Sequence, residues 1–475
     1  MTVGRVLYLR TTAAFLAMLI VFSPIRAFSS APAELVGEGP EQILSLSAAV
    51  EFALSNSSSA EKAVLGRLSS ELALDKRLTA YRPKATAALR PVVLTGKDSR
   101  IEAGWLEGLN LKAELHGLSG WEVSLSNQIQ TENRETKGIS LRADFALWPR
   151  PRHSAEVLGL LGAEESLSLA RREEMNVAQG LVIETFRRYR ALQISRERLA
   201  LYGMEFEAKK MAQARLQAKA KEGHASMLEV LRAEQDEAEA QANYQRALRD
   251  YQREWNAFLY DLSVEGQWMP ETLANDPRPQ ESYFDPNDTV DAAVEHDIAV
   301  AKAHQALLAA EREAKALQAD GNLELKGSTG LWGTPSSNLG WEAYVGLTYP
   351  LLDGGKRNIE LKEADLAVQL AKIELRDRQK QIKLDVGKML SDLEWLRDQA
   401  QIAASRHQGV QLEQIVKRKQ AAEGLIVDAD VLAGERALKQ AWLEWHEAVL
   451  AYHVAYLELL VATGQTLSGK EVNNF

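Results

Sequence analysis

Residues 343–357 have the sequence AYVGLTYPLLDGGKR. Apolar or aromatic side chains occupy every second position of its first seven residues, which is the period of a β-strand. Pro350 ends that strand, because proline cannot donate a ladder hydrogen bond and suits the first turn of a helix. Asp353 supplies a helix-capping acceptor, and Gly354 and Gly355 supply flexible backbone. The segment predicts a sharp strand-to-helix junction.

The junction position recurs, because the chain contains an internal repeat. A shift of 201 residues superimposes Pro149 on Pro350 and carries several later identities, namely Glu222-Gly223 with Glu423-Gly424, Val230-Leu231 with Val431-Leu432, and Tyr251 with Tyr452. An earlier match joins residues 48–51 to residues 292–295 at a shift of 244, so the first copy contains an insertion of 43 residues. Fixed-period self-similarity predicts a duplicated architecture.

Each copy has the same predicted order of elements. A helix of moderate length, about 45–80 or about 287–319, precedes alternating segments, the proline and a very long helical stretch interrupted at Gly223 or Gly424. We predict a first repeat at 44–266, a proline-containing acidic linker at 267–286, a second repeat at 287–464 and a tail at 465–475.

The long helices carry coiled-coil spacing. In the second copy, steps of seven residues meet only apolar side chains, at Leu361, Val368, Leu375, Ile382, Met389, Leu396, Ala403 and Val410. The second row of the heptad pattern is not apolar throughout, because Ala364 and Ala371 are followed at steps of seven by Arg378, Asp385 and Asp392. This pattern predicts a helix with one strongly buried seam and a solvated opposite side, as in the wall of a tunnel.

The strand segments alternate between apolar and polar side chains. Residues 139–147 place Ile139, Leu141, Phe145 and Leu147 on one face, and residues 109–115, 121–129 and 323–331 alternate in the same sense. Strands that face lipid outward and water inward have this pattern, but so does one face of a soluble sandwich. Tryptophans in or beside the strands favour the membrane barrel, because aromatic side chains gather at membrane interfaces; they are Trp105, Trp121, Trp148, Trp332 and Trp341.

The N-terminus is typical of a signal peptide, which we place at 1–31. Arg5 and Arg10 precede an apolar run at 13–22, and small residues surround Ala27 and Ala31. The alternative, a membrane anchor, needs about 20 apolar residues, and this run is shorter. No cysteine is present, so disulfides, thiolate metal sites and lipid attachment through cysteine are excluded. A formal charge of −10 suggests no nucleic-acid partner.

The sequence contains no catalytic signature that we could identify. Phosphate-loop, His-Glu-x-x-His and nucleophile-elbow motifs do not occur. His224 has no second histidine or cysteine at ligand spacing, so we interpret it as a solvated turn residue. We therefore predict a protein that is not an enzyme, with no cofactor and no metal.

Three motifs resemble the TolC-like outer-membrane efflux proteins, also called outer membrane factors. Residues 347–357 resemble that family's strand-to-helix junction, residues 422–432 its periplasmic helix turn, and Tyr81-Arg82-Pro83 the end of its first helix. The resemblance extends from about Leu44 to Gly464. The first copy departs from it, since residues 148–153 lack Asp-Gly-Gly and the 43-residue insertion is atypical.

The resemblance implies a fold that is mainly α with membrane β-barrel strands, in which duplicated helix–β-hairpin–long-helix units form a trimeric α/β-barrel channel. It implies a channel subunit of a tripartite efflux or type I secretion system, in the outer membrane of a Gram-negative bacterium. The implied partners are two further copies of the chain, a periplasmic adaptor, an inner-membrane transporter and outer-membrane lipid. About four strands per chain cannot close a barrel, so copies must share one. The alternative is a periplasmic coiled-coil adaptor or structural protein outside the membrane.

The helix turns are the predicted docking and gating sites. The resemblance suggests that an adaptor contacts Gly223 at the first turn and Gly424, Leu425, Ile426 and Val427 at the second. An intramolecular contact of the same residues is the alternative. Glu229, Asp428 and Asp430 follow the turns, where symmetry would make acidic rings at an entrance. Ordinary helix capping is the alternative for these carboxylates.

Overall fold

The computed structural model describes residues 42–89, 92–97, 100–105, 109–117, 121–131, 134–148, 155–273, 284–319, 324–333, 339–349 and 354–467. The predicted signal peptide, 1–31, lies outside the described residues, as do Pro149, Pro350, Asp353, and parts of the predicted linker and tail.

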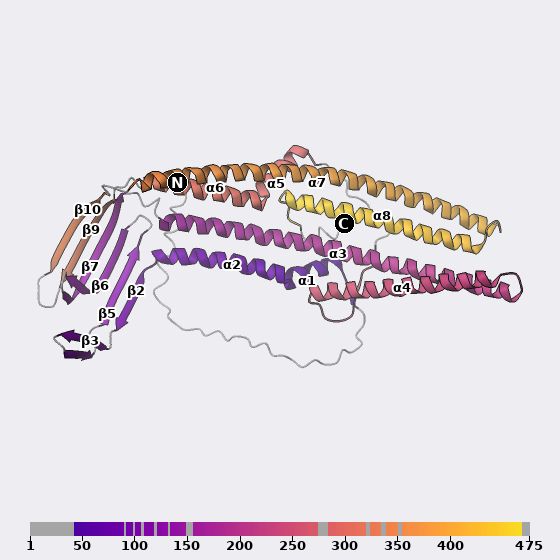
Figure 1. Cartoon of the computed structure of the whole chain (residues 1–475), viewed down its shortest axis with the longest axis horizontal. Coiled ribbons are helices and arrows are strands. Elements are labelled where there is room, and N and C mark those ends of the chain that lie inside the picture. Colours follow the sequence, from indigo (N-terminus) through magenta and orange to yellow (C-terminus); the bar gives the residue numbers. More distant parts are fainter. Residues whose placement is uncertain are drawn as a thin grey trace. The chain divides into compact units, whose positions relative to one another are not determined.

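The first copy begins with a short strand and two helices, continues through six strands, and ends in two longer helices and a short strand (Figure 1). These elements are β1 (Gln42–Leu44), α1 (Leu46–Asn56), α2 (Ser58–Leu78), the 3₁₀ turn η2 (Thr79–Tyr81), β2 (Lys84–Leu89), β3 (Val92–Lys97), β4 (Arg100–Trp105), β5 (Leu109–His116), β6 (Trp121–Thr131), β7 (Arg134–Trp148), α3 (Ala155–Lys221), α4 (Met227–Asp261) and β8 (Trp268–Pro270). The second copy contains α5 (Pro286–His296), α6 (Ile298–Ala319), β9 (Glu324–Gly333), β10 (Gly340–Thr348), α7 (Lys356–Ala422) and α8 (Asp428–Ala462).

The long helices of the two copies correspond in length and position. Helices α3 and α7 have 67 residues each, and α4 and α8 have 35 each. Both pairs are offset by 201 residues, the offset of the sequence repeat. At about 1.5 Å per residue, α3 and α7 are each about 100 Å long. The predicted duplication is confirmed.

The opening helix of each copy is two helices, whereas the sequence predicted one. The Ser57 hydroxyl separates α1 from α2 by accepting a hydrogen bond from the Ser59 amide at 3.2 Å. Asp297 separates α5 from α6, since its carboxylate accepts from the Val300 amide at 2.8 Å. Serine and aspartate satisfy the free amides of a helix start, so each break is a local capping site.

The strands form an antiparallel sheet of six in the order β10-β9-β7-β6-β5-β2. Strands β3 and β4 pair with each other, and β1 pairs with β8 in parallel. The 43-residue insertion corresponds to β3–β6, which have no counterpart among the described strands of the second copy. Among the described residues this sheet contains six strands where the sequence analysis expected about four, because β5 and β6 of the insertion join it.

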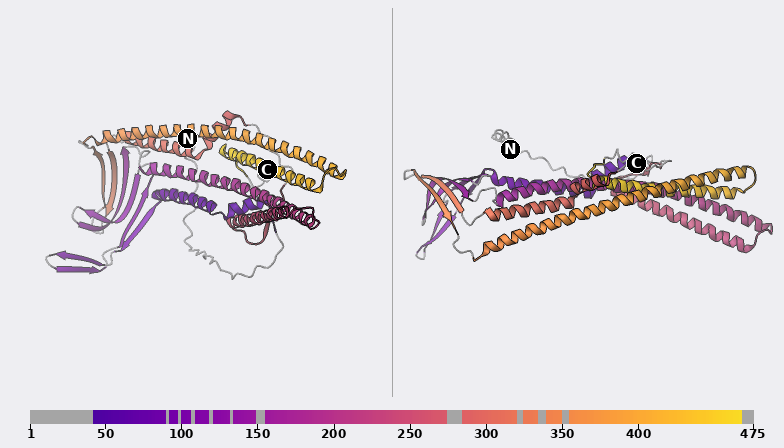
Figure 2. Two further views of the ribbon diagram at one scale, coloured as in Figure 1. Left: turned by 45° about the vertical axis from the view of Figure 1, so that its right-hand side comes forward. Right: turned by 90° about the horizontal axis from the view of Figure 1, so that it is seen from above.

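The helices α2, α3, α6 and α7 pack in that order beside the sheet, and α3–α4 and α7–α8 form two hairpins. The turns of both hairpins lie at the end of the helices away from the sheet (Figure 2). Within the described ranges, no helix is both long and apolar enough to span a bilayer.

The main core cluster joins β1, α1, α3, α4 and α8 partway along the long helices. Tyr189, Phe186 and Phe258 are buried there among leucines of the other elements. The burial of α7 differs from the prediction. The predicted seam from Leu361 to Val410 is half-buried, whereas the deepest positions are Val386, Leu393, Ala400 and Gln414, on a neighbouring heptad row. Helix α7 packs against both α6 and α8, so the side chains that it buries are distributed over more than one heptad row.

Candidate functional site: the sheet face and the helix turns

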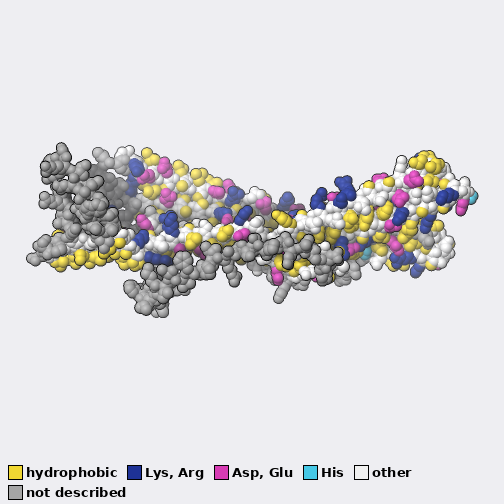
Figure 3. Space-filling view, turned by 90° about the horizontal axis from the view of Figure 1, so that it is seen from below, with side chains coloured by type: hydrophobic (Ala, Val, Ile, Leu, Met, Phe, Trp, Pro, Cys, Tyr) yellow, Lys and Arg dark blue, Asp and Glu magenta, His cyan; other side chains and the backbone are white. Residues whose placement is uncertain are grey.

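One face of the sheet is apolar across all six strands. The strand register aligns one row of side chains from edge to edge, and its members are Ala85, Ala113, Leu125, Leu141, Leu331 and Trp341. Trp341 is 74% exposed, and Leu347 and Val345 on the same strand are also exposed. In Figure 3, hydrophobic side chains lie along one margin of the sheet end of the molecule. An exposed apolar surface of this extent marks an interaction face, for another protein or for a membrane.

The opposite face of the sheet is polar. The adjacent row contains Lys84, Glu114, Ser124, Arg142, Gly330 and Glu342. The Arg142 guanidinium donates hydrogen bonds to the Tyr344 hydroxyl at 2.6 Å and the Ser328 hydroxyl at 3.2 Å, and it pairs with Asp144. These contacts connect β7, β9 and β10 on one side. Lipid on one face and water on the other is the environment that matches this division.

The tryptophans divide between the two faces. Trp121 and Trp341 belong to the apolar set, as the prediction of an aromatic girdle requires. Trp332 pairs with Ser140 and Gly340, so it belongs to the polar face instead. The prediction was wrong for Trp332, because spacing to the nearest turn, rather than residue type, determines the face of a strand residue.

The strand-to-helix junction of the second copy depends on glycine. Gly354 and Gly355 have φ of 64° and 84°, the left-handed region in which a side chain is strained. Gly355 is the N-cap of α7, and its carbonyl accepts from the Ile359 amide at 3.3 Å. The N-cap position is thus a glycine, and the predicted capping residue Asp353 lies outside the described residues.

The turn between α3 and α4 is closed by backbone hydrogen bonds around Gly223. This glycine has φ of 81°, its amide donates to Ala220, and the His224 amide donates to Lys219 at 2.8 Å. These two hydrogen bonds satisfy carbonyl groups in the last turn of α3. Neither Gly223 nor its counterpart Gly424 would meet another atom with an added Cβ, so backbone conformation rather than space selects glycine.

Helix α4 begins with a capping box. The Glu229 carboxylate accepts from the Ser226 amide at 2.7 Å, and the Ser226 hydroxyl accepts from the Glu229 amide at 3.3 Å. Hydrogen bonds from Ser226 lower the pKa of the exposed Glu229 carboxyl. Glu229 thus has the capping role that the sequence offered as the alternative to a gate.

The turn between α7 and α8 repeats the first turn without its side-chain cap. Gly424 has φ of 73°, and the Leu425 amide donates to Gln420 at 2.9 Å. Val427 is the N-cap of α8 and offers no side-chain acceptor. Leu425 is 68% and Val427 63% exposed, and Ile426 is half-buried. Asp428 is the first residue of α8 and Asp430 is exposed near it.

The first turn also carries exposed apolar side chains, which the sequence analysis missed. Met227 is 70% exposed and Leu228 is also exposed. They occupy the positions of Asp428 and Ala429 in the other copy, so the repeat alignment could have identified them. His224 is exposed, and no group of histidines and carboxylates in the described part of the chain could hold a metal ion.

Two helices at opposite edges of the helical layer expose apolar stripes. Helix α2 exposes Val64, Leu65, Leu68 and Leu72, and α7 exposes Ile359, Leu366, Leu370 and Ile373. Helix α2 leads into the edge strand β2, and α7 follows the edge strand β10. Each side of the molecule therefore has an edge strand with one unpaired side, among the described strands, and beside it a helix with an exposed apolar stripe.

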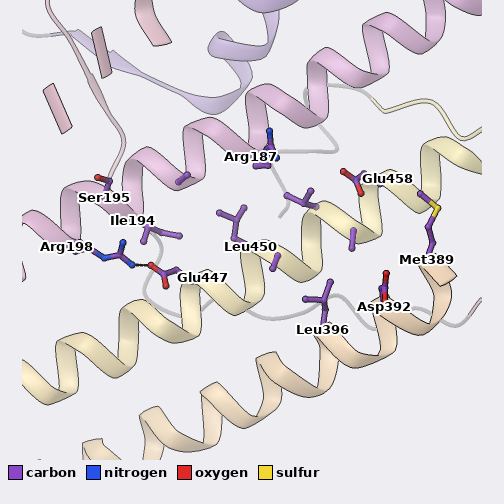
Figure 4. Close-up of a pocket in the computed structure, with 14 residues that line it drawn as sticks. Arg187, Ile194, Ser195, Arg198, Met389, Asp392, Leu396, Glu447, Leu450 and Glu458 are labelled. Atoms are coloured by element: carbon purple, nitrogen blue, oxygen red, sulfur yellow. Dashed lines mark hydrogen bonds and ion pairs between the residues drawn. The ribbon is translucent and has the colours of Figure 1, made fainter. Parts of the chain in front are cut away.

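A groove of about 580 Å³ lies between α3, α7 and α8 (Figure 4). Its wall is apolar, with Ile194, Leu396 and Leu450, and charged groups stand around it. Arg198 of α3 pairs there with Glu447 of α8. This ion pair joins the two copies of the repeat.

Comparison with known proteins agrees with the predicted family. The sequence profile of the outer membrane efflux protein family matches residues 289–465. No curated protein sequence matches the chain.

Solved structures cover nearly the whole chain. A structure of CusC, from work on its folding and transmembrane channel formation, is 13% identical with a TM-score of 0.62, covering 94% of this chain and 99% of that one. The CmeC outer membrane channel of Campylobacter jejuni is 11% identical, with a TM-score of 0.61 and coverage of 90% and 87%. The open-state MtrE outer membrane channel of Neisseria gonorrhoeae is 14% identical, with a TM-score of 0.60 and coverage of 90% of each chain.

The CmeC and MtrE structures are outer membrane channels, and the mainly helical fold with a sheet of strands at one end agrees with the sequence prediction. Residues 289–465 thus match the outer membrane efflux protein family, and the whole chain has the fold seen in the outer membrane channels CmeC and MtrE.

Proposed function

We propose that this protein is the outer-membrane tunnel subunit of a tripartite efflux or secretion system in a Gram-negative bacterium. The six strands lie in the outer membrane and the long helices extend from them into the periplasm. Substrates pass through passively, and an inner-membrane transporter supplies the energy. The observation that carries this proposal is the edge-to-edge apolar row from Ala85 to Trp341 on one face of a sheet whose other face is polar.

Several copies of the chain form one channel. In lipid, the open sides of β2 and β10 must be paired, because unsatisfied backbone groups there cost several kcal/mol each. Strand β2 leaves the helices and β10 returns to them, so β10 of one copy can pair with β2 of the next in antiparallel fashion. The exposed stripes on α7 and α2 then meet in the same contact. A head-to-tail contact that closes on itself gives a ring.

Three copies are the number that the resemblance to TolC-like channels implies. The helix turns then gather at the periplasmic end of the tunnel. There the exposed Leu425 and Val427, with Met227 and Leu228 of the other turn, provide an apolar surface for a periplasmic adaptor. Gly223 and Gly424 give both turns their shape. Asp428 is the first residue of α8 and Asp430 is exposed near it, and these two residues are our candidates for an acidic ring at this entrance.

Export by mutant cells tests this function. Cells that lack the gene should lose export of the system's substrate, and the wild-type gene should restore it. A Leu425→Asp and Val427→Asp double variant should reach the outer membrane as a trimer but fail to restore export and fail to cross-link to the adaptor. Normal export and cross-linking by this variant would contradict the docking assignment.

A further inference from the structure

The first copy of the repeat contributes more strands to the sheet than the second. The second copy provides β9 and β10, whereas the first provides β2, β5, β6 and β7. The added pair, β5 and β6, comes from the 43-residue insertion. The insertion therefore does more than lengthen an external loop.

The added strands have the two faces of the rest of the sheet. Leu111, Leu115 and Leu125 continue the apolar face, and Lys112 and Glu114 form an ion pair on the polar face. A strand with this alternation belongs in the wall between lipid and water. Strands β3 and β4 pair only with each other among the described strands, so they are the part of the insertion outside the sheet.

The directions of the strands allow sheets from several copies to join into a closed barrel. The described neighbours in the six-stranded sheet are all antiparallel. Because the number is even, β2 and β10 run in opposite directions at the two edges. The added pair thus preserves the antiparallel junction between copies, which a single added strand would have destroyed.

We propose that the insertion widens the membrane barrel to eighteen strands, six from each of three copies. This inference rests on the proposed trimeric channel. Barrel diameter grows roughly linearly with strand number, and barrels of 16–18 strands enclose an aqueous channel. The polar face would line this opening with both charge signs, from Lys112, Glu114, Arg142 and Asp144. The barrel is therefore a wide exit for bulky hydrated solutes, and it does not select by charge.

Electron microscopy of the full-length protein in lipid nanodiscs tests the proposal directly. We expect a threefold particle with eighteen strands in the bilayer, including β5 and β6 of each copy. A threefold tunnel with twelve wall strands, and β5 and β6 outside the wall, would overturn the wide barrel but leave the proposed function intact. A particle without a membrane-embedded tunnel would overturn both.

Two deletions provide a functional measurement. Removing residues 92–131 deletes β3–β6 and leaves four strands per chain joined by a short turn, and removing residues 92–105 deletes only β3 and β4. Conductance is measured in planar bilayers, with the helix turns held open in the same way in every variant. The cross-sectional area of the barrel should be roughly half that of wild type in the first variant, since area scales with the square of diameter. The second variant should conduct like wild type. The largest polymer that passes through the pore is then compared. A smaller size limit for the first variant than for wild type and the second variant would support the wide exit, and the same size limit for all three proteins would contradict it.

Discussion

The Tyr189 hydroxyl donates a hydrogen bond to the Leu44 carbonyl at 2.6 Å. It also accepts one from the Glu271 amide at 3.0 Å, so one side chain of α3 joins β1 to the segment that follows β8. Tyr189 is fully buried, and burial raises the pKa of its hydroxyl to about 12. This contact secures the start of the first repeat and the connection to the second.

Replacement of Tyr189 by phenylalanine should destabilise the protein. The change leaves the carbonyl of the buried Leu44 without this partner, and such a loss costs about 1–3 kcal/mol. Glu271 is exposed, so its amide can bond to water instead. We expect a lower thermal unfolding midpoint in detergent with the trimer still formed at room temperature. Tyr260→Phe is the control, because Tyr260 is 82% exposed. Equal midpoints for the two variants would show that the contact contributes no stability.

Alkaline pH should remove part of the stability that Tyr189 provides. A hydroxyl whose pKa is raised on folding favours the folded state fully below the unfolded pKa of about 10, and this contribution is lost as pH rises towards 12. The loss over those two pH units is about 2–3 kcal/mol. Tyr189→Phe should therefore lose less stability than wild type between pH 10 and 12, measured by the unfolding midpoint at each pH. Parallel curves for both proteins would refute this linkage.

A charge on the apolar face of the sheet should block membrane assembly. Leu141→Lys places an ammonium group towards lipid, at a cost of about 2–4 kcal/mol near the middle of the bilayer. The adjacent Ser140→Lys points to the polar face and serves as the matched control. We expect reduced trimer in the outer membrane for Leu141→Lys only. The assignment of the two faces would be reversed if Ser140→Lys were the defective variant.

The contact between copies can be tested by cysteine cross-linking, because the chain contains no cysteine. Leu72 on α2 and Leu366 on α7 lie at similar distances along their helices from the sheet. A Leu72→Cys and Leu366→Cys double variant, treated with a short bifunctional maleimide in cells, should give covalent dimers and trimers. Each single variant should give far fewer. Only monomers from the double variant would refute this contact, and bands above trimer would refute the number three.

The left-handed backbone of Gly424 should be necessary for the second turn. Gly424→Val should impair export while the protein still assembles in the membrane, because a β-branched residue in this conformation costs about 1–2 kcal/mol. Gly424→Asn should retain export, since asparagine tolerates positive φ. Export by the natural system in intact cells is the measurement. Normal export by Gly424→Val would show that the turn does not require this conformation.

The sequence predicted the duplication and the alternating face because both are carried by regular spacing. Leu141, Leu331 and Trp341 each obey the period of two, and the strand register brings them into one row. The buried row of α7 could not be predicted in this way. It includes Gln414, whose amide donates to the Val431 carbonyl at 3.1 Å, and a polar residue breaks an apolar pattern while its partner is distant in sequence.

The helix turns were located from Gly223 and Gly424, but the role of each neighbour depends on local hydrogen bonds. Glu229 and Asp430 occupy equivalent positions in the two copies, yet only Glu229 has a serine at the N-cap with which to form a capping box. The strand count was missed for a different reason. Strands β5 and β6 alternate clearly, but only their pairing with β2 and β7 places them in the sheet.

Detergent-dependent extraction from fractionated cells tests the central claim most directly. The account predicts that the mature protein sediments with the outer membrane, dissolves only in detergent, and then elutes as a trimer with open-ended tunnels visible in electron micrographs. Recovery of the protein as a monomer in the detergent-free periplasmic fraction would contradict it, and would favour a coiled-coil protein outside the membrane.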